Sequence, residues 1–337
     1  MTESSQGTTS LLDVEGLSVD YRLKSVSLRA LDDVSFRVRA GEAVALVGES
    51  GSGKTTTAMA IAGLLSPNAQ VSGGQVRYRG NRLPIQDDVA MRPHRWSETS
   101  VVFQGAMNAL NPLHRIIKQI AEPCMLKLGR SRGEAIARAR ELLELVGIPA
   151  DRGTAYPHEL SGGMRQRVMI AMALACRPSI IIGDEPTTAL DVITQAQILK
   201  LLGELRSQLN LALILITHDL SVVAESCDRV MIMYAGRIVE DGTVADIFAE
   251  PKHPYTRLLI ESIPNPVKGK RMIRPIPGDP PNLMNRPSGC AFHPRCPSAM
   301  GVCATEVPSL DKFFGGRRVA CHLHRSLTEE DKVASHA

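Results

Sequence analysis

Eight residues near the start of the chain have the types and spacing of a phosphate-binding loop. The segment 48–55 reads Gly-Glu-Ser-Gly-Ser-Gly-Lys-Thr and directly follows the continuously apolar run 43–47. Glycines let the backbone curl until successive amide hydrogens point at phosphate oxygens, and the positive end of a following helix strengthens the attraction. Lys54 is expected to neutralise the β- and γ-phosphates, and Thr55 to ligate magnesium. The predicted nucleotide-binding residues are Gly48, Ser50, Gly51, Gly53, Lys54, Thr55 and Thr56.

A pair of carboxylates further along the chain has the residue types needed to bind magnesium and to activate water for hydrolysis of the nucleotide. Asp184 and Glu185 end an apolar run that begins at about residue 179. Asp184 is expected to reach magnesium through water, and Glu185 to polarise a water that attacks the nucleotide. Acidic pairs are common at strand ends, so this one is informative because a phosphate-binding loop precedes it.

A third motif, Leu160-Ser161-Gly162-Gly163-Met164, makes little sense inside an isolated nucleotide site. Ser161 and the two glycines open an expected helix, which makes a second anion-binding helix start. A simple helix cap is the alternative interpretation.

In this order the three motifs resemble those of the ATP-binding subunit of an ABC transporter. The resemblance covers about residues 11–250 and includes the segments 184–191 and 216–219. It implies that Glu185 is the catalytic carboxylate, that His218 contacts the γ-phosphate and that Gln104 touches magnesium. Gln104 would also signal to the transmembrane subunits.

The resemblance also assigns residues outside the phosphate-binding loop. Tyr21 matches the aromatic that stacks on adenine, although taken alone a tyrosine there would be structural. Asp191 would communicate between the two sites of a dimer. The residues that would close over ATP bound by the partner subunit are Ser161, Gly162 and Gly163. ATP binding would thus bring two subunits face to face, and hydrolysis would let them open.

Short periodic segments indicate an α/β fold. Alternating patterns at 11–21 and 34–39 predict half-buried strands, and the apolar runs 43–47, 179–182 and 211–216 predict central parallel strands. Helices are expected at 55–65, within about 106–160 and at 190–205, and a hairpin at 234–242. The 106–160 region contains a capping box, Ser131 to Glu134, followed by an apolar stripe expected to pack in the core.

The fold class is therefore a P-loop ABC ATPase core with an antiparallel β subdomain and a helical subdomain, plus a small loop-rich C-terminal metal-binding segment. The expected boundaries are a flexible tail at 1–10, a nucleotide-binding domain at 11–250 with its helical subdomain at about 106–160, the C-terminal segment at 251–325 and a tail at 326–337.

The C-terminal segment is rich in proline, so long helices are not expected there. Its residues 250–259 resemble the tail of dipeptide, oligopeptide and nickel importer ATPases. Four cysteines follow within 32 residues, at Cys290, Cys296, Cys303 and Cys321. Thiolates this close together are ligands for a metal, which would supply the staple that a loop-rich segment lacks.

The resemblance to dipeptide-importer subunits implies that these cysteines hold a [4Fe–4S] cluster. Zinc is an alternative, with His322 or His324 able to replace Cys321, and four unligated thiols are another. Cys124, Cys176 and Cys227 lie in apolar or helical surroundings and are expected to be buried and inert.

Composition narrows the function classes. The net charge of +4, with basic residues interspersed among acids, argues against nucleic acid as a partner. Residues 1–10 lack the features of a signal peptide, and no stretch approaches the ~18 apolar residues of a spanning helix. We therefore expect a cytosolic chain, peripheral at the cytoplasmic face of the cell membrane. Seven cysteines in such a chain argue against a disulfide framework.

Together these features predict an ATP-hydrolysing subunit of an ABC importer for dipeptides or oligopeptides, with ATP, Mg²⁺ and a [4Fe–4S] cluster as its cofactors. Its expected partners are two transmembrane permeases, a similar but distinct second ATPase and an external solute-binding protein. Nickel, glutathione or another small cargo is the alternative within the family. A soluble ABC ATPase acting on ribosomes or DNA, and an ATPase gated by a cysteine redox sensor, are the rivals outside it.

Overall fold

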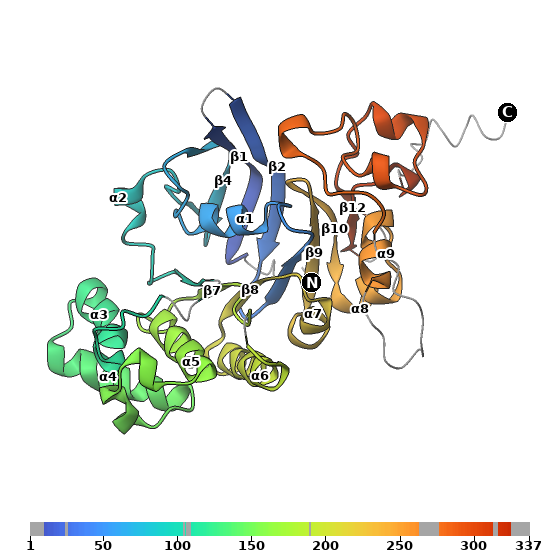
Figure 1. Ribbon diagram of the computed structural model, residues 1–337. Helices are drawn as coiled ribbons and strands as arrows, with labels where there is room; N and C mark the ends of the chain where they lie inside the picture. Colours follow the sequence, from blue (N-terminus) through green and yellow to red (C-terminus); the bar gives the residue numbers. More distant parts are fainter. Residues whose placement is uncertain are drawn as a thin grey trace, which may run out of the picture.

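The computed structural model describes residues 10–23, 26–103, 105, 109–188, 190–262, 276–312 and 316–324. Its strands form two sheets (Figure 1), one antiparallel in the order β2-β1-β4-β5 and one mixed in the order β11-β12-β10-β9-β3-β8-β7-β6. The antiparallel sheet contains β1 (Leu12–Leu23), β2 (Val26–Val38), β4 (Ala69–Tyr78) and β5 (Asn81–Arg82). The mixed sheet contains β3 (Ala43–Val47), β6 (Thr99–Val102), β7 (Ile180–Asp184), β8 (Ala212–Thr217), β9 (Arg229–Tyr234), β10 (Arg237–Thr243), β11 (Asp311–Lys312) and β12 (Arg318–Val319).

The helices lie on both sides of the mixed sheet and in a separate layer beyond it. They are α1 (Lys54–Ile61), α2 (Asp88–Met91), α3 (Ile116–Leu128), α4 (Arg132–Leu145), α5 (Gly162–Ala173), α6 (Val192–Leu209), α7 (Leu220–Ser226), α8 (Val244–Ala249) and α9 (Pro254–Glu261). In the described part of the chain, no helix is both long and apolar enough to cross a membrane.

The central strand β3 explains why the run 43–47 is apolar at every position. It pairs in parallel with β8 on one side and β9 on the other. Val44 and Leu46 pack into the core shared with the antiparallel sheet, whereas Ala45 and Val47 pack into the core on the opposite face. A strand covered on both faces needs apolar residues throughout. The strands predicted at 43–47, 179–182 and 211–216 and the hairpin β9–β10 are confirmed.

Helices α3, α4 and α5 form a layer of their own, in green in Figure 1. Helix α4 begins with the predicted capping box, since the Ser131 amide donates to the Glu134 carboxylate at 2.8 Å and the Glu134 amide donates to Ser131 Oγ at 3.4 Å. Leu142, Leu143 and Val146 are buried in the core beneath it. The interpretation of this apolar stripe as core packing is confirmed.

The C-terminal segment has its own apolar anchor, which no local sequence pattern predicts. Tyr255 of α9 and Phe292 are almost completely buried and pack against Tyr234 of β9, with ring centroids 4.7–5.3 Å apart. Burying a large aromatic side chain contributes about 2–3 kcal/mol. The segment was expected to lack a staple other than a metal, but an aromatic cluster shared with the sheet holds it.

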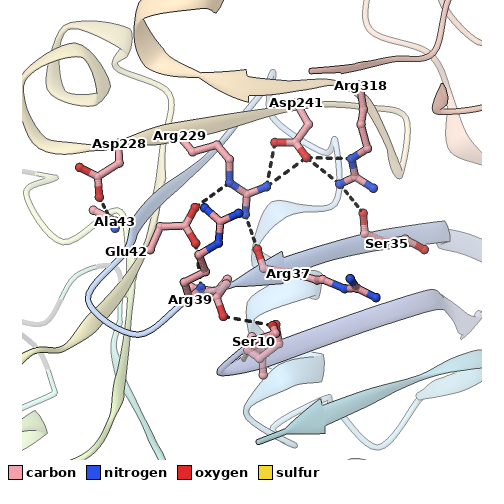
Figure 2. Close-up of polar contacts among 12 residues, drawn as sticks. Ser10, Ser35, Arg37, Arg39, Glu42, Ala43, Asp228, Arg229, Asp241 and Arg318 are labelled. Atoms are coloured by element: carbon pink, nitrogen blue, oxygen red, sulfur yellow. Dashed lines mark hydrogen bonds and ion pairs between the residues drawn. The ribbon is translucent and has the colours of Figure 1, made fainter. Parts of the chain in front are cut away.

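Ion pairs add to this anchor. Four arginines of the segment bind four acids of the preceding domain: Arg286 to Asp32, Arg295 to Glu49, Arg317 to Glu240, and Arg318 to Asp241. Figure 2 shows the last of these, in which Asp241 of β10 lies between Arg318 of β12 and Arg229 of β9. Arg229 also binds Glu42, just before β3. The segment is thus tied to both sheets by charge as well as by packing.

Candidate functional site

The phosphate-binding loop joins the carboxyl end of β3 to the start of α1. Gly51 and Gly53 have φ angles of +75° and +107°, in the left-handed region that favours glycine. A Cβ at position 48 would lie 2.1 Å from the carbonyl oxygen of Met233, so only glycine fits there. The loop is therefore curled and pressed against β9, with α1 pointing its amino end into it.

Lys54 is folded back into this loop. Its side chain is largely buried, and its Nζ donates to the carbonyl oxygens of Gly48 at 2.8 Å and Glu49 at 2.9 Å. Burial lowers the pKa of Lys54, while the charges of Glu185, Asp184 and Glu49 oppose that shift. A buried ammonium held at the centre of the loop is placed to pair with a phosphate that enters it.

Thr55 and Asp184 meet beside the loop. Thr55 Oγ1 donates to Asp184 Oδ1 at 3.2 Å. Burial raises the pKa of Asp184, and the neighbouring charge of Glu185 adds to that effect. A hydroxyl and a desolvated carboxylate side by side fit a magnesium ion, because Mg²⁺ prefers oxygen ligands and its charge would offset the desolvation.

Glu185 is aligned by contacts on both oxygens of its carboxylate. One oxygen lies 3.1 Å from His218 Nδ1, and the other accepts from Thr188 Oγ1 at 3.0 Å. Burial opposes ionisation, but these hydrogen bonds and the nearby His218 hold the pKa of Glu185 below its usual value. The backbone of Glu185 has a φ of +47° and its amide donates to the carbonyl of Ile216 in β8. The carboxylate is therefore ionised at neutral pH and held in one direction.

The sheet order brings these groups together. β3, β8 and β7 are neighbours and run in parallel, so the residues that follow them share one edge of the sheet. Tyr21 of β1 lies beside the same edge, with its hydroxyl 3.4 Å from Thr56 Oγ1. Gln104, predicted to join this site, lies outside the described residues.

The Ser161–Gly163 motif lies elsewhere, at the start of α5, which is apart from α1 in Figure 1. Ser161 caps α5 by accepting from the Met164 amide at 3.3 Å. A Cβ on Gly163 would lie 2.6 Å from Thr194 Cγ2. Thr194 in turn donates its amide and its hydroxyl to Asp191, at 3.0 and 2.7 Å. The structure therefore places this motif next to Asp191 and away from the chain's own phosphate-binding loop.

Comparison with known proteins decides the family. Residues 31–188 match the family model for the ABC transporter, and residues 239–303 match that for the oligopeptide/dipeptide transporter, C-terminal region. The chain is 46% identical to the oligopeptide transport ATP-binding protein OppD of Salmonella typhimurium, over 95% of this chain and 96% of that protein. It is also 46% identical to the dipeptide transport ATP-binding protein DppD of Haemophilus influenzae, over 93% and 95%. The chain belongs to the ATP-binding subunits of peptide ABC transporters.

A solved structure supports the fold of this subunit. A dimeric ATP-binding cassette in a post-hydrolysis state, bound to ADP and Pi, superposes with a TM-score of 0.62 and 29% identity, over 69% of this chain and 98% of that one. The ABC ATPase fold is thus shown. Since nearly the whole of that cassette matches about two thirds of the subunit, the subunit is longer than a bare cassette.

One set of contacts on the phosphate-binding loop of the subunit was not predicted from the sequence. Glu49, an unspecified position of the motif, binds Arg295 with its carboxylate and Tyr255 with its amide. Both partners belong to the C-terminal segment, more than 200 residues away. No local pattern marks such a pair. The available signal was chemical: a buried carboxylate such as Glu49 and a buried guanidinium such as Arg295 each need a partner of opposite charge.

The predicted metal centre is not supported. Among the described residues, no three His, Cys, Asp or Glu side chains are placed to hold a metal ion. The loops that carry Cys290, Cys296, Cys303 and Cys321 are closed by backbone hydrogen bonds instead, such as that from the Cys290 amide to the Cys303 carbonyl at 2.8 Å. Burial raises the pKa of Cys321 to about 11, and it raises those of Cys290 and Cys296 as well. As folded, these three groups are protonated thiols at neutral pH.

Two of the other three cysteines are buried, as expected. Cys124 and Cys176 are buried and Cys227 is half-buried. Burial raises the pKa of Cys176 to about 11 and that of Cys227 to about 12. Neutral thiols in apolar surroundings are weak nucleophiles, which agrees with a packing role.

Proposed function

We propose that this subunit binds MgATP at the edge formed by β3, β7 and β8 and hydrolyses it to power the import of oligopeptides or dipeptides. The proposal depends on one observation, which is that three groups lie together at that edge. They are the Lys54 ammonium, the Thr55–Asp184 pair and the Glu185–His218 pair. The peptide cargo is supported by the identity to oligopeptide and dipeptide relatives, which favours it over nickel or glutathione.

In this proposal each group has one task. The amides of residues 48–55 and the Lys54 ammonium bind the β- and γ-phosphates. Thr55 and Asp184 hold magnesium, which supplies positive charge to the phosphate oxygens. Glu185 accepts a proton from the water that attacks the γ-phosphorus, the bond to the β-phosphate oxygen breaks, and ADP and phosphate leave. His218 orients the γ-phosphate, Gln104 contacts magnesium and Tyr21 stacks on adenine.

The second nucleotide contact comes from a partner subunit. Ser161, Gly162 and Gly163 would face the ATP of a second, similar but distinct ATPase, and Asp191 would link the two sites. Two observations support this: the related cassette is dimeric, and Val192 and Ile193 beside Asp191 are largely exposed apolar side chains. Exposed apolar residues next to functional groups are typical of an interface.

Two transmembrane permeases and an external solute-binding protein complete the proposed transporter, with this subunit peripheral at the cytoplasmic face. The test is to isolate the tagged subunit from detergent-solubilised membranes and to identify its partners by mass spectrometry. Two multi-spanning proteins and a second ATPase are expected, with ATPase activity that rises when the peptide-loaded binding protein is added. Recovery only from the soluble fraction, with ribosomal or DNA-repair partners, contradicts the importer.

The [4Fe–4S] cluster and its zinc alternative stand apart from this chemistry. As folded, the four cysteines do not fit either group, so no step of the proposed mechanism passes through a metal. Iron, sulfide and zinc analysis of the subunit, purified without oxygen, tests whether the four cysteines bind a cluster or a zinc ion in the cell. About four irons and four sulfides per chain would support the [4Fe–4S] cluster, and one zinc per chain would support the zinc alternative. If neither metal is found, the four cysteines are unligated thiols.

A further inference from the structure

Two residues of the C-terminal segment, Tyr255 and Arg295, bind Glu49 of the phosphate-binding loop. The Tyr255 hydroxyl accepts a hydrogen bond from the Glu49 amide at 2.9 Å. The Arg295 guanidinium binds both oxygens of the Glu49 carboxylate, at 2.7 and 2.9 Å. An arginine that binds a carboxylate through two parallel hydrogen bonds fixes its direction as well as its distance.

Both partners of Glu49 are rigidly held. Tyr255 is fully buried between Tyr234 and Phe292. Arg295 also donates to the Tyr234 hydroxyl at 3.1 Å and to the Pro277 carbonyl at 2.8 Å, and only 7% of its side chain is exposed. A contact from such well-packed groups constrains the loop more than one from a flexible surface chain.

Glu49 passes this constraint to Lys54. The Glu49 carbonyl is one of the three oxygens that hold the Lys54 ammonium, with the Gly48 carbonyl and Ser52 Oγ. Its amide, its carboxylate and its carbonyl are therefore fixed by Tyr255, Arg295 and Lys54 respectively. In addition, the guanidinium offsets a carboxylate charge that would otherwise repel an incoming phosphate.

We propose that Arg295 and Tyr255 are positioning residues for the phosphate-binding loop, so that the C-terminal segment forms part of the ATP site. This inference rests on the proposed function, because it assumes that the loop binds MgATP. The segment acts through Glu49, and displacing it weakens nucleotide binding without removing any group that touches the nucleotide.

The test compares two arginines of the same segment in the full chain. Arg295→Ala frees the loop, whereas the control Arg318→Ala breaks an ion pair to Asp241 of β10 (Figure 2). The hydrogen bonds of Arg318 go to Asp241 and to the Ser35 carbonyl, and neither residue belongs to the loop. The dissociation constant of MgADP, which is not hydrolysed, is measured by calorimetry, together with the melting temperature without nucleotide. Arg295→Ala is expected to weaken binding about 5- to 20-fold, within the range of couplings between linked sites. Arg318→Ala should lower the melting temperature and leave the dissociation constant unchanged.

A double-mutant cycle with Glu49→Ala separates positioning from general destabilisation. If Arg295 acts through Glu49, Arg295→Ala has almost no further effect on binding in the Glu49→Ala background, and Arg295→Lys restores part of the affinity lost in Arg295→Ala. Equal weakening in both backgrounds, or a normal dissociation constant for Arg295→Ala alongside a lowered melting temperature, overturns the inference. Failure of the unmodified chain to bind MgADP and MgATP would instead refute the proposed function.

Discussion

Asp184 and Glu185 are adjacent carboxylates in different surroundings. Burial raises the pKa of Asp184, and the hydrogen bond from the Thr55 hydroxyl only partly opposes that shift. Glu185 is less buried, and its hydrogen bonds with His218 and Thr188 hold its pKa below the usual value. Neighbouring carboxylates whose pKa values move apart have different tasks. This difference supports the proposed roles, in which Asp184 holds the cation and Glu185 polarises the attacking water.

Glu185→Gln tests that assignment at the scale of one residue. The amide keeps the shape of the side chain but accepts no proton from water, so kcat for ATP hydrolysis should fall by about 10²- to 10⁴-fold. MgATP binding, measured by calorimetry, should be retained. Thr188→Val is the matched control, because it removes one hydrogen bond to the carboxylate and leaves the base, and it should lower kcat by less than about tenfold. A Glu185→Gln variant with more than a tenth of normal turnover would show that another group is the base.

At the scale of elements, the contact between the starts of α5 and α6 connects the Ser161 motif with Asp191. Gly163 makes this contact possible, because a side chain there would collide with the Thr194 methyl group. The Thr194 hydroxyl is held by Asp191 and cannot turn away without losing that bond. The two helix starts are therefore packed directly against each other through the Thr194 methyl group.

Gly163→Ala should force these helices apart, at a cost of about 1–3 kcal/mol in stability. It should also lower the ATPase activity of the assembled transporter, since both proposed partner-facing motifs move. Adding Thr194→Ser removes the obstructing methyl and keeps the hydroxyl, so the double variant should regain stability and activity. Ser131→Ala provides the comparison: loss of the α4 cap costs about 1 kcal/mol and leaves ATP hydrolysis unchanged. If Thr194→Ser does not rescue Gly163→Ala, the collision is not the cause.

At the scale of the whole molecule, the C-terminal segment is attached through buried polar groups around Glu240. This carboxylate is fully buried and accepts from the amides of Lys252 and His253 and from Arg317. His253 caps α9 by accepting from the Tyr255 amide through Nδ1, at 3.0 Å. Burial lowers the pKa of His253 to about 3, with a further contribution from the charge of His324.

Acid should therefore loosen this attachment. The pKa of His253 is about 3 in the folded chain and 6.5 as its reference value, so the unfolded chain binds more protons between these two pH values. The contribution of neutral His253 to the free energy of unfolding is fully present above pH 6.5 and is lost as the pH falls toward 3. Between pH 6.5 and 5 the loss is about 1–2 kcal/mol. Urea unfolding at both pH values measures the difference. His253→Asn can still cap α9 but does not titrate, and it should show a smaller difference. An equal pH dependence in both chains would mean that other groups dominate.

Local patterns were sufficient for the elements whose physical cause is local. The run 43–47 predicted a strand covered on both faces, and Ser131 with Glu134 predicted a helix start, because each depends on residues within a few positions of one another. The same holds for the curl of the phosphate-binding loop. The metal staple is not supported by the described residues, and the cysteine spacing says nothing about the aromatic cluster that holds the same loops.

The sequence by itself determined the chemistry available to this subunit: a phosphate-binding loop, a carboxylate pair and a second glycine-rich helix start, each encoded in consecutive residues. Only the tertiary structure decided which of these meet. The order of the parallel strands joins Thr55 to Asp184 and Glu185 to His218, and the packing of the C-terminal segment places Arg295 on Glu49, 246 residues away. The physical reason is that local backbone preferences depend on neighbouring residues, whereas contacts between distant segments depend on which faces are buried together.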